Sequence, residues 1–246
     1  MIIIGIDYAT DPNKTGLALG SFENEHVTIR EFRVGSKSEP PDEIIINWLP
    51  KNHPALLALD APLGWPITLG KELPSHVAGE LLRSEANDLF RRETDRVVKA
   101  KIGKQSLDVG ADKIARTAHS ALKLLHSLRD KTGLAIPLTW EMGEIRETSV
   151  IEVYPAATLK VRNIDVPSYK DKERSDKRRE LLNLLSNYVE IAPHRGALEL
   201  DANKLDAVIC VLAASDFLQG KCIPPVDEEL ARKEGWIWVQ DPDLYI

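Results

Sequence analysis

Cysteine and long apolar runs are both scarce in this chain of 246 residues, whose only cysteines are Cys210 and Cys222. Two cysteines provide neither a disulfide framework nor metal-ligand spacing, and they fit a reducing compartment. No apolar run approaches the roughly 20 residues that a membrane-spanning helix needs. The first residues lack the basic start and long apolar run of a signal peptide. We therefore expect a cytoplasmic protein without a membrane partner.

An excess of positive charge is also missing, since the formal net charge is −6. No overall basic field therefore attracts nucleic acid, and any such affinity has to come from local patches. Hydrophobic residues make up 43% of the chain and charged residues 28%, which is ordinary for a soluble globular protein. The length suits one domain over residues 1–246 that carries an insertion.

The chain begins with a strand that ends in an acid. Four isoleucines between Ile2 and Ile6 predict a central strand buried on both faces, and Asp7 ends this run. Strands are also expected at 17–22 and 27–32, with a tight turn at Asn24–Glu25 between them. Further along, the patterns predict a helix at 41–48, a strand at 55–60, mostly helices over about 67–145 with the clearest at 111–129, a strand at 148–155 and a helix at 202–218.

Four acids occupy special positions in this order: Asp7, Asp60, Glu152 and Asp206. Asp7 and Asp60 end strands, where open α/β sheets bind ligands. Glu152 lies within an apolar run, where a carboxylate is costly to bury unless it is paired or binds a cation. Asp206 lies in the first turns of the last long helix, where the helix dipole favours negative charge. Because the element order brings all four towards one edge of the sheet, we expect them to meet in one cleft.

Such a cluster predicts a divalent metal site, with all four acids as both metal ligands and catalytic residues. Carboxylate oxygens are natural ligands of Mg²⁺ and Mn²⁺. Two such ions about 3.5–4 Å apart activate a water and stabilise the leaving oxygen of a phosphodiester. Each acid also has a structural interpretation: a turn cap for Asp7 and Asp60, a helix-start residue for Asp206 and a buried ion pair for Glu152.

A local excess of positive charge lies between Phe90 and Gln105. Arg92, Arg96 and Lys99 are the residues expected there to contact the phosphates of a nucleic acid substrate, DNA or RNA. The alternative is an ordinary solvated helix face. Residues 170–179 nearly balance their charges and are interpreted as surface.

The element order resembles the ribonuclease H-like fold, and several short motifs resemble the DUF429 family, whose members are described as predicted ribonuclease H-like nucleases. The motifs lie at residues 5–7, 59–66, 92–95, 151–156, 205–207 and 234–238. The resemblance spans nearly the whole chain. It implies a five-stranded mixed sheet with helices on both faces, a helical insertion between the fourth and fifth strands, and Asp7, Asp60, Glu152 and Asp206 as the metal-binding acids of a nuclease.

Two other classes of function remain open. Phosphotransferases of the actin and sugar-kinase type share this kind of sheet, and Asp7 followed by Thr15 and Gly16 faintly resembles their first phosphate loop. Against them, Asp60 is followed by Ala61 and Pro62 rather than by a second phosphate loop. A non-catalytic binding protein, in which the acids are structural, is the third class.

Overall fold

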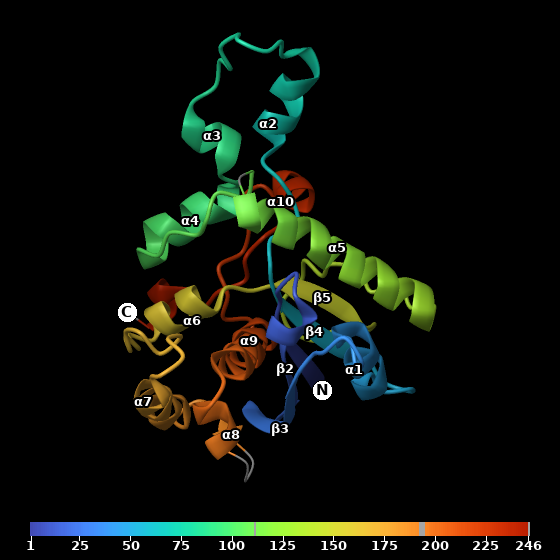
Figure 1. The fold of residues 1–246 in the computed structure, drawn as a ribbon, viewed down its shortest axis with the longest axis vertical. Coiled ribbons are helices and arrows are strands. Elements are labelled where there is room, and N and C mark those ends of the chain that lie inside the picture. Colours follow the sequence, from blue (N-terminus) through green and yellow to red (C-terminus); the bar gives the residue numbers. More distant parts are fainter. Residues whose placement is uncertain (111, 192–194, 246) are drawn as a thin grey trace.

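The computed structural model describes residues 1–110, 112–191 and 195–245 as an α/β fold built on one mixed sheet (Figure 1). The sheet has six strands in the order β5-β4-β1-β2-β3-β6. The prediction of five strands is therefore wrong by one: a strand of two residues is too short to show a period-2 pattern. The strands are β1 Ile2–Asp7, β2 Gly16–Glu23, β3 His26–Val34, β4 Ala55–Asp60, β5 Ser149–Glu152 and β6 Glu190–Ile191.

The apolar strand predicted at the start of the chain forms the centre of the sheet. β1 pairs in parallel with β4 and antiparallel with β2, so it is a central strand as expected. The turn between β2 and β3 falls at Asn24 and Glu25, which both have positive φ values, 51° and 65°. Two such residues give the hairpin a turn whose twist matches that of its strands.

Helices cover both faces of the sheet. α9 (Ala202–Leu218), confirmed at its predicted bounds, contacts β1, β2, β3 and β4 on one face. α1 (Pro41–Trp48) and α5 (Asp112–Thr132) contact each other and pack on the opposite face (Figure 1). The predicted first residue of α5, residue 111, lies outside the described residues. Alternation along the strands therefore sends Ile3 and Leu56 towards α9, and Ile4 and Leu57 towards α1 and α5.

The segment between β4 and β5 is helical, as predicted. Its first part, residues 67–90, stands away from the rest of the molecule (Figure 1). None of the helices in the described ranges is long and apolar enough to cross a membrane. The remaining elements are η1 Pro12–Lys14, α2 Ile67–Glu72, η2 Leu73–Ser75, α3 Ala86–Phe90, α4 Glu93–Ile102, α6 Pro155–Val161, α7 Ser175–Leu185, α8 Gly196–Glu199, α10 Glu228–Glu234 and η3 Pro242–Tyr245.

A glycine in β1 allows α9 to approach the sheet closely. A Cβ atom on Gly5 would lie 2.1 Å from the backbone oxygen of Ala207. We expect Gly5→Ala to destabilise the protein by at least about 1–3 kcal/mol, because the backbone of a long helix has to move. Gly70→Ala in α2 is the control: nothing lies within 4 Å of its Cβ position. Chemical denaturation of both variants tests this, and equal stability would contradict the close approach.

Candidate active site

Three of the four predicted acids meet at the carboxyl edge of the sheet. Asp7 and Asp60 are register partners on the parallel strands β1 and β4. Alternation places both side chains on the face that α9 covers, because Leu56 and Ala58 point to the same side as Asp60. Asp206 comes from the first turns of α9, and its side chain is only 2% exposed. We call Asp7, Asp60 and Asp206 the acid cluster.

The acid cluster has unusual proton affinities. Burial raises the pKa of Asp7 well above its ordinary value, and repulsion from Asp206 and Asp60 adds to this. Burial, together with repulsion from Asp206, raises the pKa of Asp60 to about 7. Burial also raises the pKa of Asp206, although a neighbouring lysine opposes the effect. Raised pKa values of this kind are expected for carboxylates that share a site and repel one another.

Lys170 and Tyr169 are the immediate partners of the acid cluster. The Lys170 ammonium lies 2.5 Å from Asp206 Oδ2, and the Tyr169 hydroxyl donates a hydrogen bond of 2.7 Å to Asp206 Oδ1. Partial burial works against the charge of Lys170, but attraction by Asp206, Asp7 and Asp60 outweighs it and raises the pKa of Lys170. One lysine thus partly neutralises three acids.

The loop that carries Lys170 is anchored by a buried arginine. Arg178 of α7 is 3% exposed, and its guanidinium donates to the backbone oxygens of Tyr169, Asp171, Lys172 and Glu199. The interpretation of residues 170–179 as surface is therefore wrong for Arg178, whereas Lys170 is exposed as predicted even though its ammonium contacts Asp206. Neither contact stands out in the sequence, because charge balance says nothing about the partners that each charged side chain finds.

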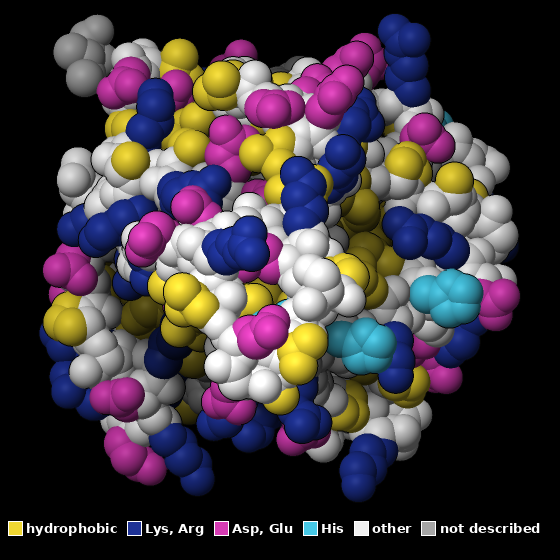
Figure 2. All heavy atoms as spheres, turned by 90° about the horizontal axis from the view of Figure 1, so that it is seen from above, with side chains coloured by type: hydrophobic (Ala, Val, Ile, Leu, Met, Phe, Trp, Pro, Cys, Tyr) yellow, Lys and Arg dark blue, Asp and Glu magenta, His cyan; other side chains and the backbone are white. Residues whose placement is uncertain are grey.

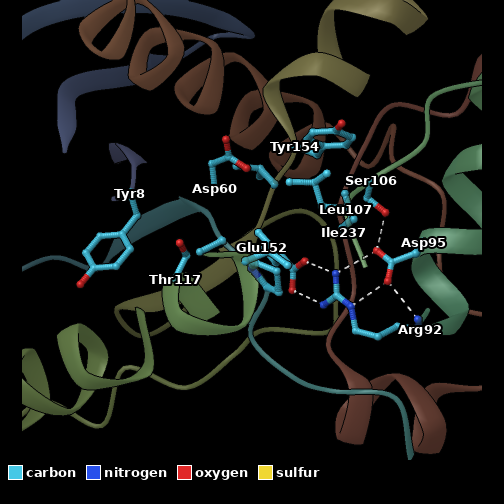
Figure 3. Close-up of a pocket in the computed structure, with 14 residues that line it drawn as sticks. Tyr8, Asp60, Arg92, Asp95, Ser106, Leu107, Thr117, Glu152, Tyr154 and Ile237 are labelled. Atoms are coloured by element: carbon cyan, nitrogen blue, oxygen red, sulfur yellow. Dashed lines mark hydrogen bonds and ion pairs between the residues drawn. The ribbon is translucent and has the colours of Figure 1, made fainter. Parts of the chain in front are cut away.

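Glu152 does not belong to the acid cluster, which corrects the prediction of four converging acids. In the register of β4 and β5, Glu152 is paired with Leu59, one position before Asp60. A shift of one residue sends a side chain to the opposite face of a sheet. Val150 accordingly packs with Leu57 and Leu59 on the side of α1 and α5. Figure 3 shows the Glu152 carboxylate turned towards Arg92 and away from Asp60.

Glu152 instead joins a buried ionic network centred on Arg92. The Arg92 guanidinium donates to both oxygens of Glu152, at 2.9 and 2.7 Å, and to both oxygens of Asp95, each at 3.1 Å (Figure 3). The exposed fractions of these three side chains are 1%, 2% and 0%. Burial raises the pKa of Glu152, with Arg92 opposing it. Since Arg92 binds both oxygens, the pair is ionised. We call Arg92, Asp95 and Glu152 the Arg92 network.

The Arg92 network also fastens the helical insertion to the sheet. Arg92 Nη1 donates to the backbone oxygen of Glu234 at 3.2 Å. The Glu234 carboxylate accepts hydrogen bonds from the backbone nitrogens of Ile67 and Glu93, at 2.8 and 2.7 Å. These two residues begin α2 and α4. The segment after α10 then runs beside the edge strand β5, where the backbone nitrogen of Trp238 donates to the backbone oxygen of Glu152 at 2.9 Å.

The structure does not place the predicted substrate-binding residues on one basic surface. Arg92 is buried, and the nitrogens of its guanidinium already donate to Asp95, Glu152 and the backbone oxygen of Glu234. Arg96 is 41% exposed and pairs with Asp88 at 3.3 Å. Lys99 is exposed on α4. On the face seen in Figure 2, Lys and Arg side chains are interspersed with Asp and Glu. Contact of Arg96 and Lys99 with phosphate stays a prediction.

A cavity of about 270 Å³ opens between the acid cluster and the Arg92 network. Asp60, Glu152 and Arg92 all line this cavity (Figure 3). We call it the central cavity. The tyrosines on its wall are held in place: the Tyr8 hydroxyl lies 2.7 Å from Ser120 Oγ, and the Tyr154 hydroxyl donates to the backbone oxygen of Gln105 at 3.2 Å. Its lining also includes apolar side chains, among them Leu107, Ile114 and Ile237.

The acid cluster fits a hard divalent cation in its donor chemistry, because all its donors are carboxylate oxygens. Within residues 1–110, 112–191 and 195–245, no group of three or more His, Cys, Asp or Glu side chains is arranged as a metal site. Asp206 is bound to Lys170 and Tyr169 instead. A cation and Lys170 would therefore compete for the same carboxylate.

The fold and the acid cluster define an α/β protein with an acidic site at the carboxyl edge of a mixed sheet. The family described as "Protein of unknown function (DUF429)" matches residues 5–230, so the chain belongs to this family. Comparisons with curated proteins and with solved structures found no match.

Proposed function

We propose that the protein is a divalent-metal-dependent nuclease of ribonuclease H-like architecture, which hydrolyses a phosphodiester bond at the acid cluster. The supporting observation is the convergence of Asp7, Asp60 and Asp206 from two parallel strands and a helix, with Lys170 paired to Asp206. Three neighbouring carboxylates repel one another, and a divalent cation removes that repulsion. A cytoplasmic location and a nucleic acid substrate, DNA or RNA, belong to the same proposal.

Asp7, Asp60 and Asp206 would hold the Mg²⁺ or Mn²⁺, and Glu152 would not. The bound metal would supply an activated water and charge stabilisation for the leaving oxygen. The chain itself contributes the positions of the carboxylates, which rigid elements fix: a strand register for Asp7 and Asp60, and a packed helix for Asp206. Tyr169 keeps the Asp206 carboxylate in one orientation by its hydrogen bond.

The central cavity is the proposed place of the substrate next to the scissile bond. It contains Asp60, and Tyr8 and Tyr154 offer aromatic surface on its wall. Aromatic side chains stack on bases without strong sequence preference. This arrangement suits a nucleotide whose base lies in the cavity and whose phosphate lies at the acid cluster.

We expect purified protein to cleave single- or double-stranded DNA or RNA in Mn²⁺ or Mg²⁺. Asp7→Asn should lower the rate about 100-fold or more, the scale of removing one group that stabilises charge in the transition state. The matched control is Asp130→Asn, the same chemical change at an exposed position of α5, which should cleave normally. Metal-independent cleavage, or equal rates of the two variants, would contradict the proposal. Nucleotide affinity without cleavage would favour the phosphotransferase class instead.

A further inference from the structure

A second cavity beside the acid cluster is lined by three lysines. Lys104, Lys160 and Lys170 share a cavity of about 250 Å³ in which Asp165 is the acidic residue. Lys104 follows α4, Lys160 lies in α6, and Lys170 is on the loop anchored by Arg178. We call it the lysine cavity. Its three positive charges against one negative charge contrast with the chain, whose net charge is −6.

Two of these lysines lack an acidic partner in the part of the chain that the structure describes. Lys101 pairs with Asp241 and Asp243, and Lys131 pairs with Asp42, but Lys104 and Lys160 form no such pair there. Isolated lysines of this kind are usually solvated surface residues. These two differ because they share a concave site with a third lysine that already contacts an acid of the proposed active site.

The lysine cavity and the central cavity are neighbours. Lys104 lines the lysine cavity, while Ser106 and Leu107, two and three residues further on, line the central cavity. Between them, the backbone oxygen of Gln105 accepts the hydrogen bond from Tyr154, another residue of the central cavity. A short wall thus separates a cavity with tyrosine side chains from a cavity with lysine side chains.

We infer that the lysine cavity binds a phosphate group of the substrate, adjacent in the strand to the phosphate that is cut at the acid cluster. This inference rests on the proposed function. Lysine ammonium groups bind phosphate as point charges. A nucleotide carries both an aromatic base and a phosphate, which matches the chemistry of the two neighbouring cavities. The ligand class is therefore a nucleotide phosphate, either a terminal monoester or an internal diester.

The inference also gives Lys170 two alternative partners. Its side chain is 56% exposed and contacts Asp206, yet it also lines the lysine cavity. A phosphate in that cavity draws the ammonium away from Asp206, which leaves the acid cluster more negative. Phosphate and divalent cation should therefore bind with positive coupling, and such coupling is reciprocal.

The test measures binding rather than cleavage. Short oligonucleotides of one sequence, with and without a 5′-phosphate, are titrated by fluorescence anisotropy into metal-free protein in chelator at low salt. We expect Lys160→Ala and Lys104→Ala each to weaken binding about tenfold, the effect of one charge-assisted contact, and to flatten its salt dependence. Lys160→Arg keeps the charge and should bind nearly as the wild type does. The matched control is Lys51→Ala, an exposed lysine that precedes β4, at the opposite edge of the sheet.

Each outcome decides a different point. Weakening confined to the phosphorylated oligonucleotide supports a terminal phosphate in the lysine cavity, and equal weakening of both supports an internal one. If Lys160→Ala and Lys104→Ala bind as Lys51→Ala does, the inference is overturned. Because the measurement is made without metal, lysine-dependent binding by a protein that cleaves nothing would refute the nuclease and leave the phosphate site. Normal cleavage, together with oligonucleotide binding that Lys160→Ala and Lys104→Ala leave unchanged, would support the nuclease and refute the phosphate site.

Discussion

Replacing Arg92 by methionine is expected to cost about 3–5 kcal/mol of unfolding free energy, which is a large part of the stability of an ordinary domain. Arg92 is the cation between Glu152 and Asp95, and all three side chains are buried. Methionine leaves two carboxylates without a counter-charge in the interior, where an unpaired charge is most costly. The same change also removes the bond to the backbone of Glu234.

Arg96→Met is the matched control for this prediction, because it makes the same change four residues further along the chain, on α4. Arg96 is 41% exposed, and an exposed pair contributes at most about 1 kcal/mol. Glu152→Gln should be intermediate, since one acceptor oxygen remains for Arg92. Urea denaturation of the three variants measures the order. Similar stabilities of Arg92→Met and Arg96→Met would mean that the Arg92 network does not hold the insertion.

The order of elements was predictable because each main element has its own local pattern. The apolar run before Asp7, the turn at Asn24–Glu25 and the helix at 202–218 all lie where the sequence predicts them. Two positions of the acid cluster follow directly, since parallel strands bring their ends together. The position of Asp206 follows once α9 packs on the face of the sheet to which Asp7 and Asp60 point.

Which residues belong to the site was predicted less well, because this depends on contacts between residues far apart in the sequence. Glu152 has the burial expected of a metal ligand, but a register shift of one residue turns it to the other face and towards Arg92. The excess of arginine and lysine over residues 90–105 does not reveal that Arg92 is its buried member. Lys170 reaches Asp206 across 36 positions of sequence, a pairing without any local signal.

Asp60→Asn is expected to make the metal-free protein more stable at neutral and higher pH, although it removes a group of the proposed active site. Burial and repulsion raise the pKa of Asp60 to about 7 in the folded protein, against about 3.9 in an unfolded chain. Below pH 4 both states are protonated and folding is not penalised. As the pH rises towards 7, the unfolded state releases its proton first, so stability falls until the folded carboxyl also ionises.

Asparagine keeps the shape of Asp60 but does not titrate, so the penalty disappears. Between pH 5 and pH 8 the variant should gain about 2 kcal/mol relative to the wild type, less than the full pKa difference because the neighbouring carboxyl groups of Asp7 and Asp206 titrate in concert with Asp60. Denaturation in chelator at both pH values measures this, with Asp130→Asn as the exposed control. In Mn²⁺ the wild type should become more stable than Asp60→Asn, because a ligand stabilises the protein that binds it more tightly. A stability difference that stays constant with pH in chelator would contradict a strained acid cluster, and an equal Mn²⁺ response of both proteins would exclude Asp60 as a metal ligand.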